Sequence, residues 1–186
     1  MKATDILMSE HRVIEQVIAA LEMAANGLEH GVDVRPGFFG DVADFIKGFA
    51  DGCHHKKEEG VLFVAMSESG VPVQGGPIGM MLYEHEQGRL YTRRMREAAA
   101  NLSDDPSARE AVLENAFGYA SLLKQHILKE DRILFPMADR FIPPAEQEAV
   151  AEGFERLEHD ETGAGVHEKY LALAAALTQE SARYTV

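Results

Sequence analysis

The chain has 186 residues, enough for one domain with a sizeable buried core. Its 31 Asp and Glu outnumber its 18 Lys and Arg, and the resulting net charge of −13 argues against a nucleic-acid-binding surface. The single Cys excludes a disulfide framework and is typical of a reducing compartment. No apolar run approaches the roughly 18 residues of a membrane span, and the N-terminus lacks the apolar region of a signal peptide. We therefore expect a cytoplasmic protein that binds neither nucleic acid nor membranes.

The sequence predicts helices almost throughout and shows no strand alternation. Thr4 is a suitable N-cap for a first helix, in which apolar residues recur every three or four positions. A second helix is predicted over about residues 38–67. The third begins at a proline and covers about residues 77–102, and the fourth continues over about 106–140 with a kink at Pro136.

Four long helices with short connections favour an up-down-up-down four-helix bundle over about residues 4–140. One or two further helices, within about residues 144–181, are expected to pack on the bundle as a C-terminal helical extension. The predicted fold class is therefore all-α, with residues 1–186 forming a single domain.

An internal repeat is the strongest functional signal in the chain. The pattern His-x-x-x-Glu, followed by an acidic residue and then by Leu-Phe, occurs twice. Its His and Glu are His54 and Glu58 in the first copy, and His126 and Glu130 in the second. The Leu-Phe pair fixes this frame, so the matching residues are these and not their neighbours one position later.

A second element, Glu followed by His, precedes each motif. Its histidines are His11 and His85, and each lies a similar distance before the motif His, 43 positions in the first half and 41 in the second. Each half of the chain thus pairs one helix that carries a His with one that carries His-x-x-x-Glu. This agreement is what a pseudo-two-fold site would require.

The spacing of the motif suits metal binding. Residues four positions apart share one face of a helix, so each motif presents an imidazole beside a carboxylate. Four His and two Glu suffice for two ions if each Glu bridges both, and a solvent bridge would leave one octahedral position open on each. Mixed imidazole and carboxylate ligands suit iron or manganese better than a closed structural zinc. The predicted metal ligands are His11, His54, Glu58, His85, His126 and Glu130.

With these residues the sequence resembles the hemerythrin-like (HHE cation-binding) family over roughly residues 4–140. The order of His, His-x-x-x-Glu, His and His-x-x-x-Glu, with Leu-Phe after each motif, carries the resemblance. The resemblance implies a four-helix bundle that holds a non-haem di-iron centre of two Fe ions, joined by an oxo or hydroxo bridge. The six residues above match the metal ligands of the family, with the two Glu as bridges.

The sequence departs from the oxygen-carrying hemerythrins in the third helix, where those proteins have a second His four positions from the first. Here these positions hold Met81 and Arg89, and a solvent-facing side chain is expected for Arg89. The second motif also ends in Glu130, where the carriers use a more distant Asp. The departures predict a more open site, in which Gly88 could leave space for a small ligand, and they put reversible O2 carriage in doubt.

Other residues near the motifs have two interpretations each. His55 is either a surface neighbour of the site or an alternative ligand. Tyr119 shares a face with His126 and either donates a hydrogen bond near the metals or packs in the core. Cys53 is expected to be a small core residue. Three further histidines are expected to be solvated: His30, His159 and His167.

The leading hypothesis is a di-iron protein that binds or reacts with O2, peroxide or nitric oxide. The alternatives are a sensor of iron or oxygen, an iron-handling module similar to iron-sulfur repair factors, and a metal-free helical interaction module. The residue patterns leave open whether the protein is an enzyme and whether it has a protein partner.

Overall fold

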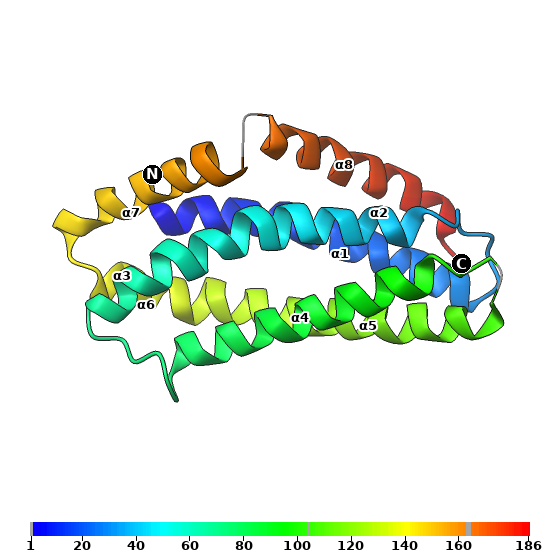
Figure 1. The fold of residues 1–186 in the computed structure, drawn as a ribbon, viewed down its shortest axis with the longest axis horizontal. Helices are drawn as coiled ribbons and strands as arrows, with labels where there is room; N and C mark the ends of the chain where they lie inside the picture. The colour runs from blue at the N-terminus through cyan, green and yellow to red at the C-terminus, as the bar shows by residue number, and fades with distance from the viewer. Residues whose placement is uncertain (1, 104, 163–164) are drawn as a thin grey trace.

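The computed structural model describes residues 2–103, 105–162 and 165–186. Over these ranges the chain is helical and contains no strand, which confirms the predicted all-α fold. Four long helical segments run antiparallel side by side and form the bundle (Figure 1). None of the described helices combines the length and the apolar character that crossing a bilayer would require.

The first half of the bundle contains two of the four segments. The first segment is α1 (Ala3–Glu29). The second is continuous from Phe38 to Glu68 and changes its hydrogen-bonding pattern along its length. It consists of α2 (Phe38–Phe45), the π-helical segments η1 (Ile46–His55) and η2 (Glu58–Leu62), and α3 (Phe63–Glu68).

The second half repeats this plan. The third segment is α4 (Pro77–Ala99), which has its proline in the first turn, where no backbone donor is needed. The fourth is capped by Asp105, whose carboxylate accepts a hydrogen bond from the backbone N–H of Ser107 at 2.8 Å. It consists of α5 (Pro106–Lys129), the π-helical η3 (Glu130–Leu134) and α6 (Phe135–Phe141).

Two of the π-helical segments, η2 and η3, lie at matching places in the two halves, whereas η1 has no counterpart because α5 is α-helical up to Lys129. Glu58 is the first residue of η2, and Glu130 is the first residue of η3. Pro136 is the second residue of α6, the helix that follows η3. Short π-helical insertions are rare and occur frequently at functional sites, so both motifs lie where the helix geometry is locally altered.

The C-terminal extension lies along one side of the bundle (Figure 1). Its first part contacts α1 and η2, and its second part contacts α1 and α2. Close contacts seat it: Tyr170 packs over Gly48, where a Cβ atom would lie 1.8 Å from the tyrosine ring. The extension comprises α7 (Pro144–Leu157), η4 (Glu158–Thr162), α8 (Val166–Ser181) and the short 3-10 helix η5 (Ala182–Tyr184).

Two apolar clusters fill the core on either side of the predicted ligands. The larger cluster is rich in Phe and Ala and includes Ile14, Phe49 and Ile127. The smaller one includes Leu7 and both Leu-Phe pairs of the repeated motif. Along each long segment the His and Glu of the repeat fall between residues of the two clusters, so the polar site is enclosed by apolar packing.

Candidate metal centre

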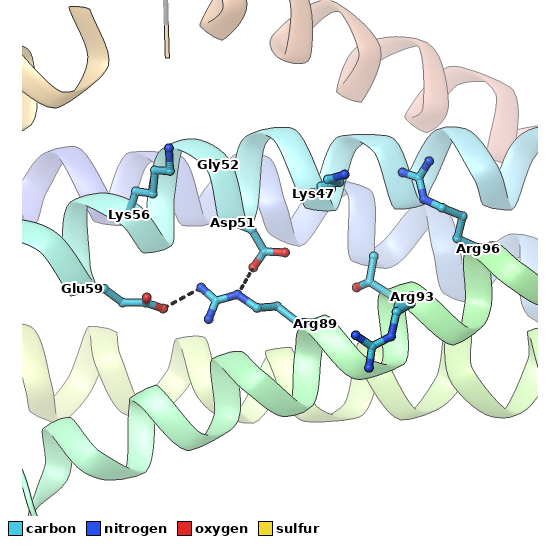
Figure 2. Close-up of a pocket in the computed structure, with 9 residues that line it drawn as sticks. Lys47, Asp51, Gly52, Lys56, Glu59, Arg89, Arg93 and Arg96 are labelled. Atoms are coloured by element: carbon cyan, nitrogen blue, oxygen red, sulfur yellow. Dashed lines mark hydrogen bonds and ion pairs between the residues drawn. The ribbon is translucent and has the colours of Figure 1, made fainter. Parts of the chain in front are cut away.

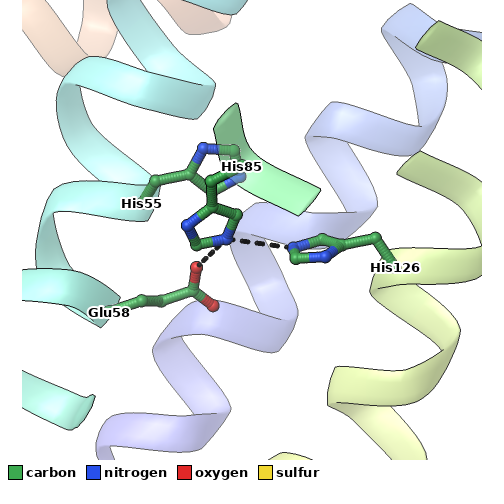
Figure 3. Close-up of side chains that lie close together, drawn as sticks. All are labelled: His55, Glu58, His85 and His126. Atoms are coloured by element: carbon green, nitrogen blue, oxygen red, sulfur yellow. Dashed lines mark hydrogen bonds and ion pairs between the residues drawn. The ribbon is translucent and has the colours of Figure 1, made fainter. Parts of the chain in front are cut away.

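All six predicted ligands, together with His55, lie in two adjoining clusters inside the bundle. In each cluster, one nitrogen or oxygen atom per residue lies within 4.8 Å of those of the other members, and every member is buried. The first cluster, drawn in Figure 3, consists of His55, Glu58, His85 and His126. The second consists of His11, His54, Glu58 and Glu130.

The carboxylate of Glu58 faces both clusters. Its Oε1 atom is 3.4 Å from Nε2 of His54, and its Oε2 atom is 3.4 Å from Nε2 of His85. One oxygen therefore points toward a His of each cluster. This is the arrangement expected of a carboxylate that bridges two ions.

Glu130 holds the corresponding place in the second half. Its Oε2 atom is 3.2 Å from Nε2 of His11 and 3.2 Å from Nε2 of His126. These two histidines belong to different clusters, so Glu130 also lies between the two.

Two of the histidines are oriented by carboxylates of the Glu-His element. Nδ1 of His54 lies 2.9 Å from Oε2 of Glu10, whose other oxygen pairs with the ammonium of Lys57 at 2.5 Å. The second half repeats this arrangement at the same 2.9 Å distance, with His126, Glu84 and Lys129. Both imidazole rings are thus fixed by a carboxylate that is itself neutralised by a lysine.

The other two histidines of the repeat are held by the acidic residue that follows each motif Glu. Nδ1 of His85 lies 2.7 Å from Oε1 of Glu59, and the same oxygen accepts from the guanidinium of Arg89 at 2.7 Å. The first half of the chain has the matching contacts, again at 2.7 Å for the imidazole, in His11, Asp131 and Arg12. The pseudo-two-fold relation therefore extends to the residues behind the predicted ligands.

His55 is buried, with 3% of its surface exposed, so its interpretation as a surface residue is wrong. Its Nδ1 lies 2.9 Å from Oδ1 of Asp51, and its ring stacks on that of His85 with centroids 3.8 Å apart. The matching position in the second motif is Ile127, which is also buried. The apolar side chain of Ile127 at the matching position is the sequence signal that could have placed His55 in the interior.

The inward-facing atoms have the chemistry of metal ligands. Where Nδ1–H donates to a carboxylate, a neutral imidazole has its lone pair on Nε2. Nε2 of His85 and Nε2 of His126 are only 3.1 Å apart, and two facing lone pairs need a cation or a proton between them. Six further atoms are buried without a hydrogen-bond partner among the described residues: Nε2 of His11 and His54, and both oxygens of Glu58 and Glu130.

Without an ion, protons compensate the buried carboxylates. Burial lowers the pKa of His54, but Glu58 and Glu10 outweigh it and raise the pKa to about 10. The pKa of His126 is raised to about 9 because Glu130 similarly outweighs burial. These protons occupy the positions that metal ions would take, and ligands must lose them on binding. The cluster chemistry therefore fits one or more divalent cations.

Arg89 is 31% exposed and does not simply face solvent. Its guanidinium lies between Glu59, at 2.7 Å, and Asp51, at 3.5 Å (Figure 2). These are the two carboxylates that hold His85 and His55. Arg89 therefore connects the outer partners of two histidines of the first cluster.

Gly88 does not leave open space beside the clusters. A Cβ atom at this position would lie 3.3 Å from Leu123 and 3.6 Å from the ring of Tyr119, so the glycine allows α4 to pack closely on α5. Tyr119 is buried, as the core interpretation requires, but its hydroxyl has no hydrogen-bond partner among the described residues. It remains a candidate donor in the interior.

The sequence also makes predictions for four residues outside the clusters. Cys53 is buried, which confirms the core assignment, and both His30 and His159 are exposed, as predicted. The prediction for His167 is wrong, because its ring packs against Phe49 with centroids 5.3 Å apart.

A third group of potential ligands already has a cation. It consists of Glu10, Glu158 and His167. The ammonium of Lys57 lies 2.5 Å from Glu10 and 3.0 Å from Glu158 and neutralises the group. We therefore place no metal there.

A helical bundle with two buried clusters of His and Glu that could hold metal ions is the arrangement expected of a hemerythrin-type domain. The model of the hemerythrin HHE cation-binding domain matches residues 2–138, and the chain belongs to this family. Uncharacterized proteins of Mycobacterium tuberculosis and Mycobacterium bovis are 25% identical to it over 163 residues. The match covers 87% of this chain but 63% of each relative, so the chain spans less than two thirds of their length. No solved structure matches the chain.

Proposed function

We propose that the protein binds two iron ions at the adjoining clusters and that the loaded centre binds or reacts with a small oxidant: O2, peroxide or nitric oxide. The observation that carries this proposal is that Glu58 belongs to both buried clusters, with one oxygen directed to each. A carboxylate shared in this way supports two neighbouring ions better than one. The family is named for cation binding, which agrees with the proposal.

The clusters supply a ligand set for each ion. His55, His85 and His126 would hold one ion, His11 and His54 would hold the other, and the two Glu would serve both. With a solvent-derived bridge, the first ion would have six ligands and the second five. This assignment replaces the sequence-based expectation of one open position on each ion, because His55 adds a ligand to the first. The open position would lie on the side of His11 and His54.

Iron at such a centre would supply electron exchange and a coordination position for the oxidant. The residues of the chain would fix the ligand geometry and limit access of water. Glu10 and Glu84 orient two rings through Nδ1, and partners of this kind commonly strengthen metal affinity. Tyr119 would hold a proton on its buried hydroxyl, because burial raises its pKa well above the ordinary value.

The test begins with anaerobic addition of ferrous iron to the full chain, followed by oxidation. We expect azide to bind the oxidised protein and change its absorption spectrum, and air or peroxide to oxidise the reduced protein. A chain that takes up no iron would overturn the whole proposal. Iron uptake with protease resistance, but neither binding of nor reaction with any of the three oxidants, would overturn the oxidant chemistry and favour a sensor. A stable, reversible O2 complex would show binding without reaction and would favour a carrier.

A further inference from the structure

A surface pocket of about 580 Å³ lies beside the first cluster, between η1 and α4 (Figure 2). Its volume is within the usual range for small-molecule sites, about 300–1,000 Å³. Five of the lining side chains are basic and two are acidic, although the whole chain has a net charge of −13. The basic residues are Lys47, Lys56, Arg89, Arg93 and Arg96.

The basic side chains differ in how far they are already neutralised. Arg96 pairs with Asp44, and Arg89 pairs with the two acidic residues of the pocket. Within the described ranges, neither Lys47 nor Arg93 forms an ion pair. Cations gathered around a concave site and left without carboxylates attract an anion, and a guanidinium can bind a carboxylate or phosphate through two parallel hydrogen bonds.

The inner wall of the pocket consists of the carboxylates that orient two histidines of the first cluster. Asp51 holds His55, and Glu59 holds His85. Arg89 bridges both carboxylates and also borders the pocket. An anion that recruits the Arg89 guanidinium would therefore weaken its pairing with the carboxylates behind the two imidazoles.

We propose that this pocket binds a small organic anion with a carboxylate or phosphate group, and that Arg89 transmits its binding to the first cluster. The binding step depends on the pocket alone. The transmission step rests on the proposed iron centre, because its effect is a change at ligands of that centre. The occupant would be a regulator or co-reactant bound beside the metals, distinct from an oxidant bound at them.

The binding test uses titration calorimetry on the full chain, both iron-loaded and metal-free, with succinate, phenyl phosphate and inorganic phosphate as probes. We expect at least one organic anion to bind more tightly than inorganic phosphate, and added salt to weaken the binding. Arg93→Ala should weaken it by about tenfold or more, the factor typical of losing one charge-assisted hydrogen bond. Arg94→Ala, which removes an exposed arginine next to it outside the pocket, should change it by less than about twofold.

The transmission test records the absorption spectrum of the iron-loaded chain while the organic anion is added. The spectrum should shift with the same midpoint as the calorimetric binding, and Arg89→Ala, saturated at a higher anion concentration, should lack the shift. Equal anion affinity of the Arg93 and Arg94 variants would overturn the proposal that this pocket binds the anion. So would the absence of binding of any probe to both the iron-loaded and the metal-free chain. If the unmodified chain binds the anion and Arg93→Ala weakens that binding, but the spectrum of the unmodified iron-loaded chain does not shift, the transmission step alone is overturned. Failure of iron loading with intact binding would count against the iron centre and not against the pocket.

Discussion

At the scale of single residues, His54 and His55 are adjacent in sequence but enter different clusters. Both end the π-helical segment η1, where the backbone departs from the regular α-helix. His55 is fixed by Asp51, one turn earlier on the same helical segment, and by stacking on His85, which belongs to α4. The two histidines therefore contribute to separate ions in our assignment.

Replacing His55 with Ala should lower the iron content from two ions per chain to about one. The first cluster would lose one of three imidazoles, whereas the second cluster would keep all of its members. Metal analysis after iron loading and desalting measures the change. His30→Ala, at an exposed position, is the control and should retain both ions. Two tightly held ions in the His55 variant would show that this residue is not a ligand.

Glu10→Gln and Glu84→Gln should lower metal affinity by similar factors, roughly 10- to 100-fold, as is typical for partners behind metal-bound histidines. The two carboxylates occupy equivalent places, each 2.9 Å from Nδ1 of a motif His and each paired with a Lys. Competition with a chelator measures the affinities. A large effect of one substitution and none of the other would contradict the pseudo-two-fold relation.

The sequence was sufficient to predict that the six His and Glu of the repeat gather inside the bundle, because a spacing of four along a helix is a local property. Their role as metal ligands stays a prediction. His55 could not be assigned from the repeat, since its counterpart Ile127 is not a ligand type and its role depends on how η1 faces α4. The outer carboxylates were visible as matching residues, Glu10 with Glu84 and Glu59 with Asp131. Their partners, however, lie on other helices, and this pairing comes from tertiary packing.

At the scale of helices, the C-terminal extension depends on close approach at Gly48. Gly48→Ala should destabilise the protein by about 1–3 kcal/mol, because the new methyl group overlaps the ring of Tyr170 on α8. Gly40→Ala is the matched control in α2, where a Cβ atom meets nothing within 4 Å. It should stabilise the protein by about 0.5–1 kcal/mol through helix propensity. Urea unfolding measures both.

The double variant Gly48→Ala/Tyr170→Ala provides a further check on this contact. Its destabilisation should be smaller than the sum of the two single effects, because the overlap is removed together with the ring. Additive losses would mean that Gly48 is required for another reason, such as the π-helical backbone of η1.

Helix order and approximate bounds followed from periodicity and prolines, and the structure agrees within a few residues. The prediction of Thr4 as the first N-cap is wrong, because Thr4 lies inside α1 and Lys2 is the N-cap. The predicted third helix, at residues 77–102, ends instead at Ala99. The π-helical segments were not predicted, because one inserted residue barely alters the apolar pattern of a long helix.

At the scale of the whole molecule, the buried carboxylates make metal binding dependent on pH. The pKa values of about 10 for His54 and about 9 for His126 mean that both imidazoles are protonated at pH 7 without metal. Ions must displace these protons, so affinity should rise with pH up to these values, about tenfold per pH unit for each proton released.

Calorimetry of ferrous iron binding at pH 7, under anaerobic conditions in two buffers of different ionisation enthalpy, measures the protons released. We expect about two per chain when both ions bind. Binding heats that do not depend on the buffer would mean that the imidazoles are already neutral, and would contradict the assigned protonation.

The most direct test of the two-ion centre is anomalous X-ray diffraction at the iron edge from crystals of the iron-loaded chain. We predict two neighbouring peaks inside the bundle, one beside His55, His85 and His126 and the other beside His11 and His54. The carboxylates of Glu58 and Glu130 should contact both. A single peak, or iron bound only elsewhere on the chain, would contradict the account.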